Sequence, residues 1–97
     1  MGWTFESPED GQPPNLSRIR LADSRLINAR FRRIDVSHGD FTGADLTRAE
    51  LWGNRARSAC FRNADLTGIC FRGLDLTEAD LRARNYYRTQ LLACILD

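Results

Sequence analysis

Residues that could perform nucleophilic or acid–base chemistry are few in this chain. It has three cysteines, Cys60, Cys70 and Cys94, and a single histidine, His38. A cysteine nucleophile needs a base close by, and more than twenty positions separate His38 from the nearest cysteine. The sequence contains no cofactor-binding motif, no cluster of metal ligands and no catalytic constellation. We therefore expect a protein that is not an enzyme and that has no cofactor.

Arginine offers binding chemistry instead. All fourteen basic residues are arginine and none is lysine, while the net charge is only +1. A guanidinium makes planar, bidentate contacts, so one interpretation of this bias is selection for surface contacts, but genomic base composition is the simpler interpretation. A net charge this small excludes a chain that is strongly basic or strongly acidic overall.

Apolar or aromatic side chains stand at every fifth position from residue 16 to residue 96, and only Ala56 is undersized. Five residues turn a helix by about 500°, and an odd spacing alternates between the faces of a strand, so neither element would gather these side chains into one core. The spacing fits a chain that turns a corner every five residues. Four sides then close a square, and the chain returns above itself after about twenty residues.

The five-residue unit is clearest at residues 44–48 (ADLTR), 64–68 (ADLTG) and 79–83 (ADLRA). These units resemble the tandem repeats of pentapeptide-repeat proteins, well over residues 16–83 and weakly over 84–97. The resemblance implies an all-β protein, a right-handed quadrilateral parallel β-helix of about four coils.

Reading the sequence in steps of twenty predicts which residues stack inside the solenoid. Two such ladders are predicted, and each stands on its own side of the square. The two ladders are Leu21, Phe41, Phe61 and Leu81, and Phe31, Leu51 and Phe71. We interpret these aromatic residues as core and not as a cofactor site.

The chain divides into three segments. Residues 1–13 form an N-terminal arm or cap, in which we expect Trp3 and Phe5 to fold back over the first coil; a disordered arm or a partner-binding segment is the alternative. Residues 14–83 form the β-helix. Residues 84–97 form either a degenerate last coil with an apolar outer surface or a short amphipathic helix that closes the solenoid. This segment serves as a cap or as the interface of a homodimer, through Tyr86, Tyr87, Leu91, Leu92 and Ile95.

One wall of the square is the most cationic. Its outward residues are Arg30, Arg32, Arg33, Trp52 and Arg72, against Glu50. Arginine around an exposed aromatic is typical of interaction patches, so we consider this wall a candidate partner face. The alternative is a solvated wall on which Trp52 packs along arginine stems.

The cysteines fall on different sides of the square, so we expect free thiols and a cytoplasmic location. The sequence has no signal peptide and no apolar run long enough to span a membrane.

We expect a rigid protein–protein interaction module whose partner is unknown. The resemblance offers one alternative, since some pentapeptide-repeat proteins modulate DNA gyrase as DNA mimics, but such mimicry needs an extended acidic surface. A second alternative is the binding of nucleic acid or another anionic partner through the arginine-rich wall.

Overall fold

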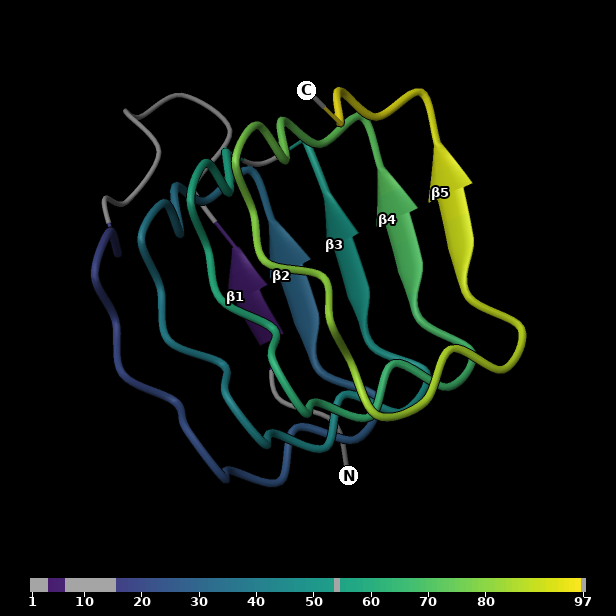
Figure 1. Cartoon of the computed structure of the whole chain (residues 1–97). Helices are drawn as coiled ribbons and strands as arrows, with labels where there is room; N and C mark the ends of the chain where they lie inside the picture. The colour runs from purple at the N-terminus through teal and green to yellow at the C-terminus, as the bar shows by residue number, and fades with distance from the viewer. Residues whose placement is uncertain (1–3, 7–15, 54, 97) are drawn as a thin grey trace.

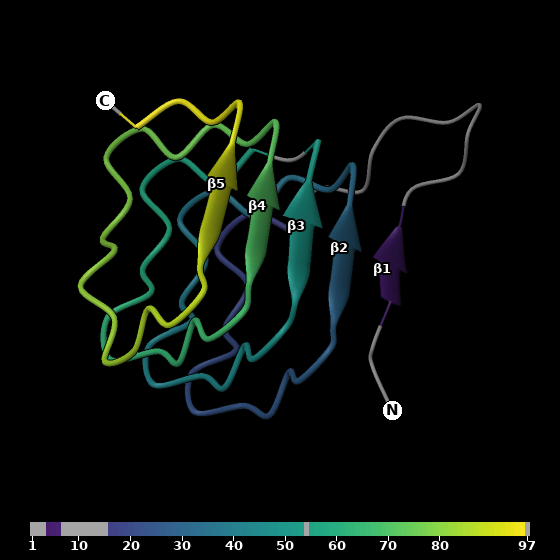
Figure 2. The same ribbon diagram turned by 90° about the vertical axis from the view of Figure 1, so that its right-hand side faces the viewer.

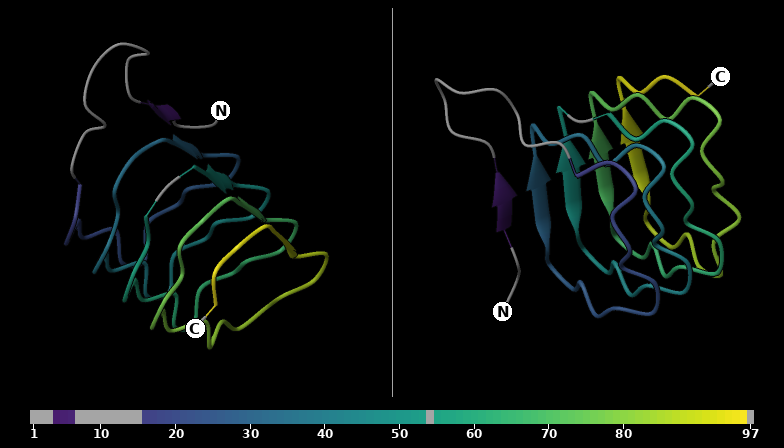
Figure 3. Two further views of the ribbon diagram at one scale, coloured as in Figure 1. Left: turned by 90° about the horizontal axis from the view of Figure 1, so that it is seen from above. Right: turned by 90° about the vertical axis from the view of Figure 1, so that its left-hand side faces the viewer.

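The structure, a computed structural model, describes residues 4–6, 16–53 and 55–96. The chain winds as a solenoid of stacked four-sided coils, as Figure 1 and Figure 3 show. It is a right-handed quadrilateral β-helix, which confirms the predicted fold class. Among the described residues there is no helix, so none is long and apolar enough to cross a bilayer.

One side of the solenoid is a parallel sheet of five short strands in the order β1-β2-β3-β4-β5. The strands lie side by side along the axis of the stack (Figure 2). Their bounds are Thr4–Glu6 for β1, Arg30–Arg32 for β2, Glu50–Trp52 for β3, Cys70–Arg72 for β4 and Gln90–Leu92 for β5. Each of β2, β3 and β4 pairs with the residues twenty positions later, as predicted.

The other three sides keep the same register through isolated parallel bridges. Asp45 bridges to Asp65, for example, and Asp65 to Asn85. Backbone hydrogen bonds join the coils at these bridges: Leu46 N donates to Asp65 O, and Asp65 N donates to Ala44 O, each at 2.9 Å. The twenty-residue step therefore holds all four sides in register.

The predicted ladders form the core. Phe41 and Phe61 stack with ring centroids 5.0 Å apart and planes 8° from parallel. Phe31 meets Phe41, and Phe71 meets Phe61, edge to face at 6.0 Å and 5.5 Å. All four rings are fully buried, as is Leu51, whereas Leu21 and Leu81 at the ends are half-buried.

The corners of the square depend on short polar side chains and on left-handed backbone. The aspartate before a central residue accepts a hydrogen bond from the backbone N–H two residues later, as Asp45 Oδ1 does from Thr47 at 3.1 Å. The last residue of most such units has positive φ, which is 69° at Gly43; Ala83 is an exception. Eleven of the fifteen described positive-φ residues are not glycine, so most corners carry the cost of an L-residue in this region.

Strand β1 extends the sheet beyond the first coil. Its residues Thr4, Phe5 and Glu6 align with Arg30, Phe31 and Arg32, a separation of more than one coil. The arm therefore adds a strand edge to edge beside β2 (Figure 2). The predicted lid contact of Trp3 lies outside the described residues.

Of the two arrangements expected at the C-terminal end, the structure has the last coil and not the helix. Strand β5 pairs with β4, and Ile95 bridges to Asp75. The segment thus keeps the twenty-residue register although its sequence departs from the repeat.

Candidate interaction face

Strands β2, β3 and β4 turn their central residues into the core and their flanking residues outward, because side chains alternate along a strand. The parallel register then aligns the outward residues in two columns along the solenoid axis. The columns consist of Arg30, Glu50 and Cys70, and of Arg32, Trp52 and Arg72. We call the second set the Arg–Trp column.

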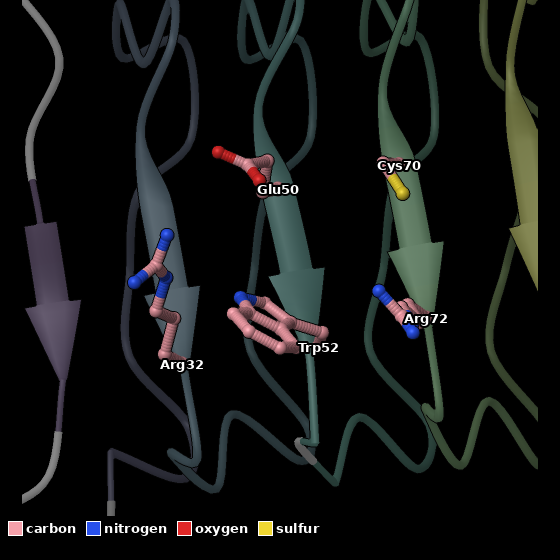
Figure 4. Close-up of a pocket in the computed structure, with 5 residues that line it drawn as sticks. All are labelled: Arg32, Glu50, Trp52, Cys70 and Arg72. Carbon is pink, nitrogen blue, oxygen red and sulfur yellow. The ribbon is translucent and has the colours of Figure 1, made fainter.

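Trp52 lies between the two arginines of the Arg–Trp column (Figure 4). The guanidinium carbon of Arg32 is 4.9 Å from the centroid of the indole ring, and that of Arg72 is 5.8 Å away. These are cation–π distances. The indole remains 37% exposed, so the two arginines orient it without covering it.

The charges of this wall are unequally paired. Arg30 Nε lies 3.1 Å from Glu50 Oε2, so the one acidic side chain of β2, β3 and β4 is paired with Arg30. Arg32 Nε is buried, and no described residue forms a hydrogen bond with it. Among the described residues no carboxylate forms an ion pair with Arg32 or Arg72. Within the part of the chain that the structure describes, the two guanidiniums of the Arg–Trp column are therefore not neutralised by an ion pair.

A shallow open groove of about 230 Å³ follows the two columns. Its lining consists of Arg32, Glu50, Trp52, Cys70 and Arg72 (Figure 4). Sequence reasoning placed three of these residues on the candidate face and named Glu50 as its counter-charge, but it missed Cys70. The twenty-residue step from Arg30 and Glu50 to Cys70 was the signal that could have found it.

Arg33, the fifth residue predicted for this face, lies apart from the Arg–Trp column. It follows β2 at a corner, with a φ of 54°. Its Cγ lies 3.5 Å from the place where a Cβ on Gly53 would stand. Arg33 therefore borders the face at its corner and does not line the groove.

The residues predicted as a dimer or cap surface are divided between two places. Tyr86 and Leu91 belong to the inner ladders, and they are exposed because no described coil follows them. The Tyr86 hydroxyl donates a hydrogen bond to Leu81 O and accepts one from Ala83 N at 3.0 Å. The Tyr86 side chain thus holds the backbone of the turn at residues 81–83 through two hydrogen bonds.

Tyr87, Leu92 and Ile95 point outward from the walls of the last coil. The guanidinium carbon of Arg88 lies 5.3 Å from the Tyr87 ring centroid, and Leu92 follows Arg72 at the end of the Arg–Trp column. All three side chains are exposed. The apolar surface of this end therefore continues onto the arginine-rich wall through Leu92.

The side chains with nucleophilic or acid–base potential are not brought together. Cys60 Sγ contacts the Thr42 hydroxyl at 3.3 Å, and Cys94 Sγ donates to Phe71 O at 3.3 Å. His38 is exposed at a corner with a φ of 60°. Among the described residues no group of three or more His, Cys, Asp or Glu side chains could hold a metal ion.

Several corner aspartates have pKa values below the ordinary value for the residue. Hydrogen bonds from the side chain and the backbone N–H of Arg82 lower the pKa of Asp80 to about 2. Hydrogen bonds from Thr67 lower the pKa of Asp65, and those from Thr77 lower the pKa of Asp75. These carboxylates accept hydrogen bonds in turns, and a lowered pKa makes them weak bases.

Comparisons with known proteins agree with this geometry. The family model for pentapeptide repeats matches residues 15–53 and 59–83, in eight copies. Eighteen chains of solved structures match; a search of curated proteins found no match.

Two of the similar structures are pentapeptide repeat proteins. One, from the thylakoid lumen of Arabidopsis thaliana, has a TM-score of 0.72 and 26% sequence identity over 77% of this chain and 52% of its own. This chain thus spans about half of that protein's length. The other, from the cyanobacterium Cyanothece 51142, has a TM-score of 0.71 and 19% identity over 99% of this chain and 82% of its own. Repeat matches over most of the length, together with the four-sided coil, show that this chain belongs to the pentapeptide-repeat family.

Proposed function

We propose that this chain is a rigid, non-enzymatic docking module that binds a protein partner through the Arg–Trp column. The observation that carries the proposal is the position of Trp52, exposed between Arg32 and Arg72, which lack an ion-pair partner among the described residues. Tryptophan and arginine are the residues most enriched where binding energy concentrates in protein interfaces. A polar outer wall has no structural need for an exposed indole at its centre.

Rigidity supports the same function. The three strands that carry the face are joined in parallel register, and the core behind them is fully buried. A preorganised surface loses little conformational entropy on binding, so more of the contact energy appears as affinity.

The proposal is tested by affinity capture from lysate of the native host, quantified by mass spectrometry. The wild type is compared with Trp52→Ala and Arg32→Glu. Arg62→Glu is the matched control, because it makes the same charge change as Arg32→Glu at an exposed position on the opposite wall. We expect a captured protein that disappears with both face variants and persists with Arg62→Glu. A capture profile that is the same for all four proteins contradicts the proposal.

A modulator of DNA gyrase that mimics DNA is the alternative suggested by the family resemblance. Such mimicry needs an extended acidic surface, whereas strands β2, β3 and β4 around the exposed tryptophan carry Arg30, Arg32 and Arg72 against Glu50. We therefore favour the docking module. A supercoiling assay with purified gyrase separates the two, because a gyrase modulator must alter supercoiling at micromolar protein.

We also propose that the C-terminal end of the solenoid binds a second copy of the chain. Leu91 and Leu96 belong to the inner ladders yet are 41% and 54% exposed, which leaves apolar surface uncovered at this end. Light scattering is expected to give twice the chain mass of 11.1 kDa, and Leu96→Glu is expected to return it to the monomer value. A wild-type protein that stays monomeric at high concentration rules out this assembly.

A further inference from the structure

The Arg–Trp column has a fixed spacing of charge. Arg32 and Arg72 stand on strands two apart, and neighbouring strands in a sheet are about 4.8 Å apart, so their backbone positions are about 9.6 Å apart. Trp52 occupies the position midway between them. The face therefore offers a cation, an apolar ring and a second cation in a line along the solenoid axis.

The surroundings of the column limit what can bind there. Glu50 lines the groove, so a continuous run of phosphates would pass close to its carboxylate. In the register of the sheet, Glu6 stands next to Arg32 at one end and Leu92 stands next to Arg72 at the other. The cationic part of the column is thus only three coils long and suits a short segment with two separate negative charges.

Within a segment of only four residues, one common conformation matches this spacing. Acidic side chains two residues apart on an extended strand are only about 6.7 Å apart, and those on one helix face three or four residues apart are about 5–6 Å apart. In a polyproline II segment the residues at i and i+3 lie on the same side, about 9.3 Å apart. That distance agrees with the two strand spacings between Arg32 and Arg72.

We propose that the Arg–Trp column binds an acidic protein segment in polyproline II conformation, with carboxylates three residues apart and an apolar side chain between them. This inference rests on the proposed docking function and names the chemistry of its partner. Arg32 and Arg72 each pair with one carboxylate, and the exposed indole of Trp52 packs against the residue between them. The exposed side chain of Leu92 extends the contact beyond Arg72.

Fluorescence anisotropy with labelled peptides tests the proposal on the full chain. One peptide contains Glu-Pro-Leu-Glu, a neutral control contains Gln-Pro-Leu-Gln, and a spacing control contains Glu-Leu-Glu-Pro. We expect the first peptide to bind about tenfold more tightly than either control, since a hydrogen bond to a charged group contributes about 1.5–3 kcal/mol and tenfold corresponds to 1.4 kcal/mol.

Variants identify the binding site. Arg32→Gln, Arg72→Gln and Trp52→Leu are each expected to weaken binding of the first peptide by about tenfold. Arg62→Gln, on the opposite wall, is expected to leave it within about twofold, as a distant surface change should. Far-ultraviolet circular dichroism checks that each variant keeps the fold.

Each contrary result overturns a defined part of the proposal. If the glutamine peptide binds equally well, the ligand need not be acidic. If the spacing control binds equally well, the ligand need not adopt the polyproline II conformation. Tighter binding of a single-stranded oligonucleotide assigns the column to nucleic acid. If no peptide binds but capture from lysate still depends on Trp52, this inference fails and the docking function stands; if capture does not depend on Trp52 either, both fail.

Discussion

Two aromatic stacks run along the axis of this solenoid, one inside it and one outside. The inner stack is Phe41 on Phe61, with parallel rings 5.0 Å apart and no exposed surface. The outer stack is Trp52 between Arg32 and Arg72, with more than a third of the indole exposed. The same twenty-residue step builds both, so register alone does not distinguish a structural aromatic from a binding one.

The neighbours of the two stacks make the difference. The inner rings are surrounded by apolar side chains from all four sides of the square, and their removal leaves a cavity. The outer ring has cations on either side and solvent in front of it. We therefore expect the inner stack to determine the free energy of unfolding and the outer stack to determine partner binding.

The largest expected effect comes from emptying the inner stack. Phe61→Ala removes a ring that contacts both Phe41 and Phe71, and it should lower the free energy of unfolding by about 3–5 kcal/mol. Urea denaturation followed by circular dichroism measures this loss. A cost below about 1 kcal/mol would mean that the ladder closes around the gap and is not the main core.

A smaller effect comes from adding one methyl group beside the inner stack. A Cβ on Gly39 would stand 2.8 Å from Val36 O and 2.9 Å from Phe41 Cε2. Gly39→Ala should therefore cost about 1–3 kcal/mol through overpacking. The cost should shrink in a Phe41→Leu background, because the ring that the methyl group meets is gone. An unchanged cost in that background would place the strain in the backbone alone.

The outer stack should contribute little to stability. Trp52→Ala removes two surface cation–π contacts, each about 0.5–1 kcal/mol at an exposed site, so we expect a loss of about 1 kcal/mol in the same denaturation series. A loss as large as that of Phe61→Ala would support the alternative interpretation, in which Trp52 packs along arginine stems as part of the structure.

The smallest expected effect is the loss of stability at low pH, and it involves residues of neither stack. The pKa values of Asp40, Asp65, Asp75 and Asp80 are lowered by hydrogen bonds at the corners, that of Asp80 to about 2. A carboxyl whose pKa is lowered on folding stabilises the protein above its unfolded pKa, near 3.9, and loses that contribution as the pH falls toward the folded value.

Thermal midpoints should therefore decline slightly between about pH 4 and pH 2, since exposed ion pairs contribute little each. Asp80→Asn should flatten the decline, and Trp52→Ala should leave its slope unchanged. A decline that stays equally steep in Asp80→Asn would contradict this assignment.

Much of the fold was predictable because its cause is periodic. A large apolar side chain every five residues requires a corner every five residues, and the same step predicted that Phe41 lies against Phe61. It also placed Arg32, Trp52 and Arg72 on one wall, since residues twenty apart share a side. Arg33 could not be separated from them, because its position depends on the left-handed backbone after β2.

The two ends were less predictable, because the repeat weakens there. The pairing of Thr4–Glu6 with Arg30–Arg32 lies outside the twenty-residue step, so no periodic argument could find it. The hydrogen bond of the Tyr86 hydroxyl with Leu81 O forms at an irregular turn, where Ala83 N donates to that carbonyl, whereas in the coil before it the residue three positions on donates to Phe61 O. Composition marked Tyr86 and Tyr87 alike as apolar surface, yet only Tyr86 joins the end of an inner ladder.

The in-register stacking has a consequence for how this chain could be lengthened or shortened. Insertion of twenty residues between Gly53 and Cys70 would add a rung and move Trp52 away from Arg72 by one strand spacing, about 4.8 Å, without disturbing any wall. Insertion of five residues would instead rotate everything downstream by a quarter turn and carry Arg72 around the corner. An insertion of twenty residues would thus change the distance between side chains on one wall, and an insertion of five residues would change the wall on which the later side chains lie.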